Sequence, residues 1–233
     1  MSNSFGFLGV IFIASCLTMA IVSEAKEIDY DDGIYPNYHV RPSKNWINDP
    51  NGPFYDPLHE KYHLFFQHNP NGAQWGDMSW GHVISDDLVT WKELPVALYN
   101  DQDYDVGGVF SGSVTLTEHL EPILLYTCVD GKGNQLQCQA TPKDRSDEEL
   151  VEWVKSPDNP IIAQAPPLVR ANEFRDPSSG WLEEGKWMTV YSALEVMMVG
   201  NKQRKVPTLP LYSSPSTLSS TIWEFKGNMM TGD

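Results

Sequence analysis

The stretch Ser85-Asp86-Asp87-Leu88-Val89-Thr90-Trp91 returns twice further along the chain in looser form. The later copies are Ser146-Asp147-Glu148-Glu149-Leu150-Val151-Glu152-Trp153 and Leu218-Ser219-Ser220-Thr221-Ile222-Trp223. The tryptophans that end the three copies, Trp91, Trp153 and Trp223, are nearly evenly spaced. Their period is longer than that of the usual helical repeats, and it suits four-stranded propeller blades joined by long loops.

A second series of polar motifs begins with Trp46-Ile47-Asn48-Asp49-Pro50-Asn51-Gly52. Asp-Pro and Asn-Gly pairs favour turns, so this run is predicted to be a rigid turn that presents the Asp49 carboxylate. The alternative is an ordinary Asx-turn between two strands, with no ligand.

Two further polar side chains, Ser111 and Asp176, follow Asp49 at nearly even spacing, and the cation Arg175 stands beside the second of them. We expect Arg175 to favour the ionised form of Asp176 and so to lower its pKa. Because the first strand of each blade lines the channel of a propeller, blades are predicted to open near residues 49, 111 and 176, and these side chains to converge.

The local sequence pattern agrees with short strands throughout. Strand-like runs are Tyr62–Gln67, Ile123–Cys128, Gln135–Ala140 and Lys186–Tyr191, and the turn 130–134 predicts a hairpin between the second and third. The chain has 17 Gly and 17 Pro. No long apolar stretch at helical spacing follows residue 25, so the chain is predicted to be all-β.

From Tyr38 to Asp233 the sequence resembles glycoside hydrolase family 32, the invertases, β-fructofuranosidases and fructan hydrolases. The motifs that carry the resemblance, in the order of the family, are Trp46–Gly52, Tyr62–Gln67, Trp75–Asp77, Trp80–His82, Phe110–Ser113 and Phe174–Pro177. The resemblance implies a five-bladed β-propeller followed by a β-sandwich. This chain would hold about the first three blades and no sandwich.

The resemblance also implies a retaining reaction on terminal β-D-fructofuranosyl units of sucrose or fructans. Asp49 matches the nucleophile, and Asp176 matches the carboxylate that stabilises the transition state. The positions that match sugar-binding residues are Trp46, Asn48, Asn51, Gln67, Trp75, Phe110, Ser111 and Arg175. Phe110 departs from the tryptophan usual at its position, and neither a cofactor nor a metal is implied.

Retention requires a second carboxyl group that gives a proton to the leaving oxygen. The family supplies it from a Glu-Cys-Pro segment, which this chain lacks, and the repeat spacing would place that segment after Asp233. We interpret Glu173 and Glu224 as surface residues. The chain is therefore expected to be a fragment or inactive, and the alternative function is a non-catalytic fructoside-binding or regulatory truncated homologue.

The N-terminus predicts a secreted protein. Residues 5–22 are apolar and Ser23-Glu24-Ala25 follows, so residues 1–25 are predicted to be a signal peptide, with 26–233 as a partial propeller domain. An uncleaved membrane anchor is the alternative. A formal net charge of −15 and a pI near 4.6 disfavour nucleic acid and anionic membranes. We expect a monomer that acts on a neutral sugar.

Cys128 and Cys138 flank the predicted hairpin turn symmetrically. This spacing would place them directly opposite each other, as a cross-strand disulfide in an oxidising compartment. Two buried free thiols are the alternative. The spacing of the cysteines does not suggest zinc.

Overall fold

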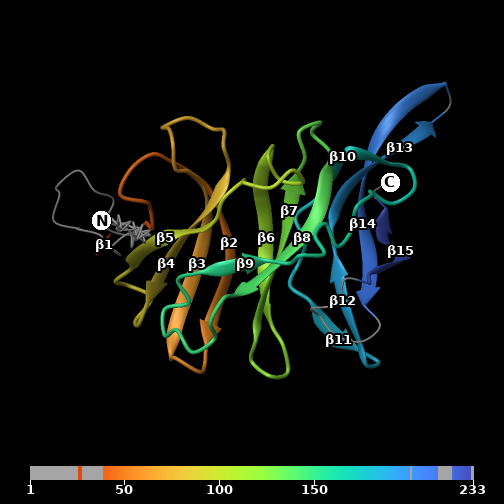
Figure 1. Cartoon of the computed structure of the whole chain (residues 1–233). Helices are drawn as coiled ribbons and strands as arrows, with labels where there is room; N and C mark the ends of the chain where they lie inside the picture. The colour runs from red at the N-terminus through yellow and green to blue at the C-terminus, as the bar shows by residue number, and fades with distance from the viewer. Residues whose placement is uncertain (1–25, 28–38, 200, 215–221, 232–233) are drawn as a thin grey trace, which may run out of the picture.

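Three antiparallel sheets stand side by side in the molecule (Figure 1). The computed structural model describes residues 26–27, 39–199, 201–214 and 222–231. The predicted signal peptide lies outside these residues. None of the described segments forms a helix with the length and apolar character needed to cross a membrane.

The first two sheets are meanders in which successive strands pair. The first contains β1 (Lys26–Glu27), β2 (Trp46–Asp56), β3 (Lys61–Asn69), β4 (Ser79–Ser85) and β5 (Lys92–Leu98), in the order β1-β5-β4-β3-β2. The second contains β6 (Gly108–Leu116), β7 (Pro122–Val129), β8 (Gln135–Pro142) and β9 (Trp153–Lys155), in chain order. The predicted hairpin is therefore confirmed as β7 and β8.

The third sheet repeats the pattern with interrupted strands. Its members are β10 (Val169–Arg175), β11 (Trp181–Glu183), β12 (Lys186–Val190), β13 (Ser192–Val199), β14 (Lys202–Ser214) and β15 (Glu224–Thr231). β12 and β13 pair with successive parts of β14, while β10 pairs with β13 and β11 with β12. β15 pairs with the other edge of β14. The described part of the chain is thus an all-β propeller fragment, as predicted, and the total of five blades stays a prediction.

The prediction of a tight turn at residues 46–52 is wrong, because this run lies within the eleven-residue strand β2. Breaks in the register with β3 flank residues 50 and 51, so the segment is a bulged strand. Gly52 has a φ of 46°, and a Cβ there would lie 2.7 Å from Cγ2 of Val114 on β6. Glycine therefore allows β2 of the first sheet and β6 of the second to approach closely.

The three repeated tryptophans lie at the start of the last strand of each sheet. Trp91 directly precedes β5, Trp153 begins β9, and Trp223 directly precedes β15. Trp153 is buried, while Trp91 and Trp223 pack against buried clusters. The sequence repeat therefore marks the last strand of each sheet.

The structure joins Cys128 and Cys138 by a disulfide, with their Cα atoms 5.9 Å apart. They do not lie directly opposite each other, as symmetry about the turn predicted. The register pairs Cys128 with Leu136 and Tyr126 with Cys138, so the two cysteines are diagonal neighbours. The turn is centred one residue earlier in the chain than the midpoint between the cysteines, which shifts the pairing by two.

Two apolar cores hold the sheets together, and we call them the first and second junctions. The first junction lies between sheets one and two and includes Phe65, Trp80, Leu124, Tyr126 and Trp153. The second lies between sheets two and three and includes Leu125, Phe174, Trp187, Tyr191 and Tyr212. Each sheet therefore shares its buried face with its neighbour.

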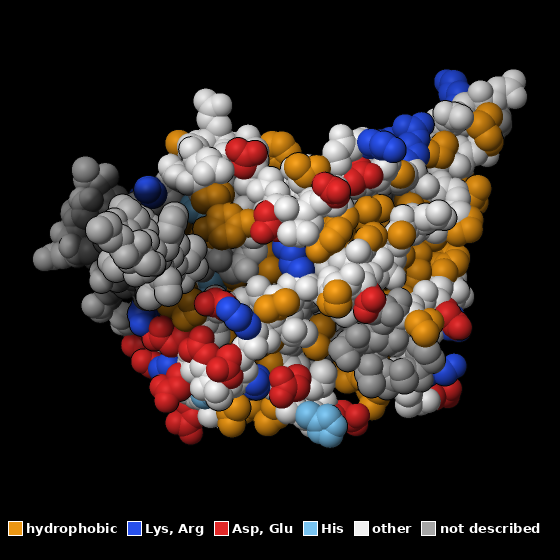
Figure 2. All heavy atoms as spheres, viewed as in Figure 1, with side chains coloured by type: hydrophobic (Ala, Val, Ile, Leu, Met, Phe, Trp, Pro, Cys, Tyr) orange, Lys and Arg blue, Asp and Glu red, His pale blue; other side chains and the backbone are white. Residues whose placement is uncertain are grey.

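Hydrophobic side chains also gather on the surface of the third sheet, at the right of Figure 2. The exposed members there include Met197, Met198, Phe225, Met229 and Met230. An exposed apolar patch of this kind marks an interaction surface.

Candidate active site

A pocket of about 300 Å³ lies where β2, β6 and β10, one strand from each sheet, meet. β2 lies against β6, and β6 lies against β10. The pocket is lined by Asn48, Asp49, Gln67, Trp75, Met78, Phe110, Ser111, Arg175 and Asp176. The three evenly spaced polar motifs of the sequence therefore converge in space.

Asp49 is oriented by a neighbour from the second sheet. The Ser111 hydroxyl on β6 donates a hydrogen bond to Asp49 Oδ2 on β2, at 2.8 Å. On the same strand the Trp46 indole N–H donates to Asn48 Oδ1, at 2.7 Å. One hydroxyl thus orients the carboxylate, and one indole orients the amide beside it.

Asp176 directly follows β10, and its carboxyl group is half-exposed. Arg175 Nε lies 3.4 Å from Asp176 Oδ2. Partial burial and the nearby charge of Asp49 raise the pKa of Asp176 above its usual value, although Arg175 acts in the opposite direction. The expected lowering of this pKa is therefore wrong, because burial outweighs the adjacent cation.

Two aromatic side chains and an amide form the remaining walls. Trp75 is 60% exposed, and its ring meets that of Phe110 edge-on at 6.0 Å between centroids. Gln67 is nearly buried, and its amide Nε2 donates to the carbonyl of Val109 at 3.0 Å. The exposed indole presents an apolar face to the pocket, whereas the Gln67 amide already binds strand β6.

Two of the expected sugar-binding residues are not among those that line the pocket. Asn51 is only 1% exposed, because the bulges in β2 turn it into the interior. Trp46 reaches the pocket only through its hydrogen bond to Asn48. Met78 lines the pocket although the sequence did not single it out. Its position next to Trp75-Gly76-Asp77 is the signal that would have found it.

The two glutamates interpreted as surface residues lie outside this pocket. Glu173 pairs with Lys205, and Glu224 pairs with Lys226. Among the described residues that line the pocket, the carboxylates are Asp49 and Asp176. No group of three His, Cys, Asp or Glu side chains within the described ranges is arranged to hold a metal ion.

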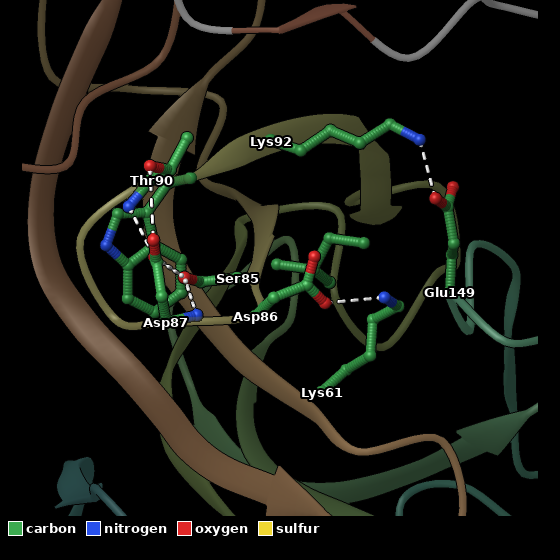
Figure 3. A pocket seen from close by; sticks show the side chains of 9 residues that line it. Lys61, Ser85, Asp86, Asp87, Thr90, Lys92 and Glu149 are labelled. Carbon is green, nitrogen blue, oxygen red and sulfur yellow. Dashed lines mark hydrogen bonds and ion pairs between the residues drawn. The ribbon is translucent and has the colours of Figure 1, made fainter.

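A larger pocket, of about 470 Å³, is lined by residues of β3, β4, β5 and the segment between β4 and β5, together with Glu149 (Figure 3). Lys61 Nζ lies 2.6 Å from Asp86 Oδ1, and Lys92 Nζ lies 2.5 Å from Glu149 Oε1. The Asp87 carboxylate accepts hydrogen bonds from its own turn. Because these charges already satisfy one another, the smaller pocket is the better candidate for chemistry.

Comparison with known proteins gives one consistent result. Residues 39–233 match the Glycosyl hydrolases family 32 N-terminal domain. An acid beta-fructofuranosidase of Phaseolus vulgaris is 48% identical over 160 residues, which are 68% of this chain and 24% of that protein. A fructan 6-exohydrolase of Beta vulgaris is 38% identical over 213 residues, which are 89% of this chain and 33% of that protein.

Solved structures agree. That of fructan 1-exohydrolase IIa from Cichorium intybus superposes with a TM-score of 0.74 at 38% identity, covering 84% of this chain and 34% of that one. A single-substitution variant of the same enzyme has been solved in complex with 1-kestose. This chain thus spans about a quarter to a third of the length of these relatives.

Proposed function

Because the chain belongs to glycosyl hydrolase family 32, through its N-terminal domain, we propose that it contributes the nucleophile side of a β-fructofuranosidase site. The substrate is a terminal β-D-fructofuranosyl unit of sucrose or a fructan. The observation that carries the proposal is the meeting of Asp49 and Asp176 in one pocket, with Ser111 bound to Asp49.

The proposed reaction is a double displacement with retention. Asp49 attacks the anomeric carbon and forms a covalent fructosyl-enzyme, which water then hydrolyses. Asp176 and Arg175 hold sugar hydroxyls and stabilise the oxocarbenium-like transition state. Trp75 stacks on the sugar, and Asn48 completes the polar contacts. The acid that protonates the leaving oxygen is not one of the described residues that line the pocket.

The proposed whole protein closes a five-bladed propeller and adds a β-sandwich. The exposed methionines on the third sheet support this, because a further blade would bury those on the face turned away from the second sheet. The intact mass of the protein recovered from its source tests the point. A mass well above that of residues 26–233 is expected. A mass equal to that of residues 26–233 would instead favour fructoside binding without turnover.

The proposed location is the secretory pathway, with release from the cell after cleavage of residues 1–25. Relatives include a vacuolar enzyme of a Rosa hybrid cultivar and an insoluble isoenzyme of Oryza sativa. Fluorescent fusions with and without residues 1–25 distinguish the apoplast from the vacuole. We propose a monomer without a cofactor.

The decisive experiment is Asp49→Ala in the protein as recovered from its source. Sucrose hydrolysis is expected to fall by about a thousandfold or more, because no nucleophile remains to form the covalent intermediate. Asp86→Ala is the matched control, since Asp86 is an exposed carboxylate of the larger pocket, and it should retain full activity. Sucrose cleavage that survives in Asp49→Ala would refute the proposal.

A further inference from the structure

The backbone that carries the Asp176 carboxylate has an unusual conformation. Asp176 has a φ of 57°, in the left-handed region that few residues other than glycine adopt. Pro177 follows directly and restricts this residue further. Such a backbone persists only where its surroundings fix it.

Three side chains from the second sheet fix it. The Thr127 hydroxyl on β7 accepts a hydrogen bond from the Asp176 N–H, at 3.0 Å. Gln135 Oε1 on β8 accepts one from the Phe174 N–H, at 2.9 Å, and Gln137 Nε2 donates one to the Phe174 carbonyl, at 3.0 Å. We call Thr127, Gln135 and Gln137 the β10 clamp.

The clamp is internally ordered and buried. Thr127 Oγ1 donates to Gln137 Oε1 at 3.4 Å, which directs the hydroxyl hydrogen away from Asp176 and leaves a lone pair for the Asp176 N–H. The exposed fractions of Thr127, Gln135 and Gln137 are 0%, 6% and 1%. Buried polar groups that are fully paired specify a single arrangement.

β10 needs such partners because it is the edge strand of the third sheet. It pairs with β13 on one side only. The clamp satisfies the opposite edge with side chains in place of a neighbouring strand. The same arrangement occurs one sheet earlier, where Gln67 binds the Val109 carbonyl and the Trp80 indole binds the Phe110 carbonyl, next to Ser111.

We propose that Thr127, supported by Gln135 and Gln137, is a positioning residue that holds the Asp176 carboxylate in the pocket shared with Asp49. This inference rests on the proposed function, and it adds residues that do not touch the sugar. In this proposal, side chains of the second sheet set the position of the Asp176 carboxylate, which belongs to the third sheet.

The test uses Thr127→Val, which removes the acceptor at nearly constant volume, and Thr127→Ser, which retains it. In the protein as recovered from its source, Thr127→Val is expected to lower kcat/KM for sucrose about tenfold. Thr127→Ser should lower it less than twofold. Both variants are then placed in an Asp176→Asn background. There Thr127→Val should cost less than twofold, because the group that it positions is already impaired. An equal tenfold loss in both backgrounds would overturn the proposal.

A titration of the Asp176 carboxyl by carbon NMR decides the matter without activity. Burial and Asp49 raise the pKa of this carboxyl, so displacement by Thr127→Val should lower it, while Thr127→Ser leaves it in place. An unchanged titration in Thr127→Val would also overturn the proposal. If the unaltered protein does not cleave sucrose, the proposed function fails, yet this readout still tests the clamp. Should Thr127→Val not fold, Gln135→Leu replaces it in the same titration, with the same expected fall in the pKa of Asp176.

Discussion

The two junctions between the sheets are built from different chemistry. The first contains buried charges and imidazoles beside its apolar core, including the ion pair of Asp56 with Arg145 and the stacked pair of His63 with His82. Hydrogen bonds from neutral side chains cross both junctions, from Gln67 and Trp80 at the first and from the β10 clamp at the second. The first junction is therefore distinguished by its buried ion pair and imidazoles, which are added to the apolar packing and neutral hydrogen bonds that both junctions have.

The difference has a physical consequence. A buried ion pair is sensitive to the loss of one partner, because the other charge is left without solvent or counter-ion. A neutral hydrogen bond costs less free energy to break. Its strength does not depend on pH over the range in which neither partner gains or loses a proton. We therefore expect the first junction to respond to charge and acidity, and the second to respond mainly to hydrogen-bond geometry.

The largest effect is expected from Arg145→Met. Arg145 donates Nη1 to Asp56 Oδ2 at 2.7 Å and also binds the Leu120 carbonyl, and Asp56 is fully buried. The variant removes the cation from the buried Asp56 carboxylate and leaves it only the His59 ring and the Leu58 N–H as partners, so the free energy of unfolding should fall by about 3–5 kcal/mol. Urea unfolding followed by tryptophan fluorescence measures it.

Two controls place this loss at the first junction. Adding Asp56→Asn to Arg145→Met should restore part of the stability, because the buried charge that has lost its arginine is removed. Gln137→Met at the second junction should cost only about 1–3 kcal/mol, since it breaks neutral hydrogen bonds. Equal losses for Arg145→Met and Gln137→Met would contradict the contrast between the junctions.

A smaller effect is expected from acid. Burial lowers the pKa of His63 from 6.5 to about 4, and burial also lowers that of His82. The folded protein therefore keeps these imidazoles neutral, while the unfolded chain binds protons below pH 6.5. The stability from His63 is complete above about pH 6.5 and is lost as the pH falls to about 4. Between pH 7 and 4.5 the loss should be about 2–3 kcal/mol.

Asp56 adds a second window at lower pH. Its buried carboxyl is bound by Arg145 and His59, and although burial acts to raise its pKa, these partners lower it to about 2. Its contribution is present above its ordinary value of 3.8 and is lost as the pH falls toward 2. The pH at which stability is lost therefore distinguishes the contribution of the imidazoles from that of the ion pair.

The variant His63→Phe distinguishes the protonation of His63 from other causes of acid destabilisation. It retains the ring that stacks on Phe54 at 4.6 Å between centroids, but it does not titrate. The urea midpoint of His63→Phe should therefore change less between pH 7 and 4.5 than that of the unaltered protein. Gln137→Met should keep the unaltered pH dependence. A full acid response in His63→Phe would assign the effect elsewhere.

The sequence predicted what recurs along the chain and missed what depends on packing between sheets. The tryptophan repeat and the spacing of Asp49, Ser111 and Asp176 predicted the sheets and the pocket, because each sheet repeats the order of its strands. The raised pKa of Asp176 could not be predicted, since it arises from burial by other sheets.

Register errors explain the other misses. Asn51 was expected in the pocket, but bulges in β2 turn it inward, and no residue pattern marks a bulge of that kind. The cysteines were expected to face each other, yet a shift in the pairing makes them diagonal. Thr127 and Gln137 look like ordinary strand residues in the sequence. Their role depends on an edge strand that lies much further along the chain.

The smallest effect is expected at the surface of the first junction, from Lys92→Met. Lys92 pairs with Glu149 across the two sheets (Figure 3), but both side chains are about one-third exposed. Water and salt screen such a pair, so the variant should lower the free energy of unfolding by less than about 1 kcal/mol, and by less still at high salt. Arg145→Met should keep most of its loss in about 1 M salt, because its ion pair is buried. If salt abolished the loss of stability in both variants alike, burial would not be what distinguishes the two ion pairs. The Arg145 pair would then contribute no more than an exposed pair does.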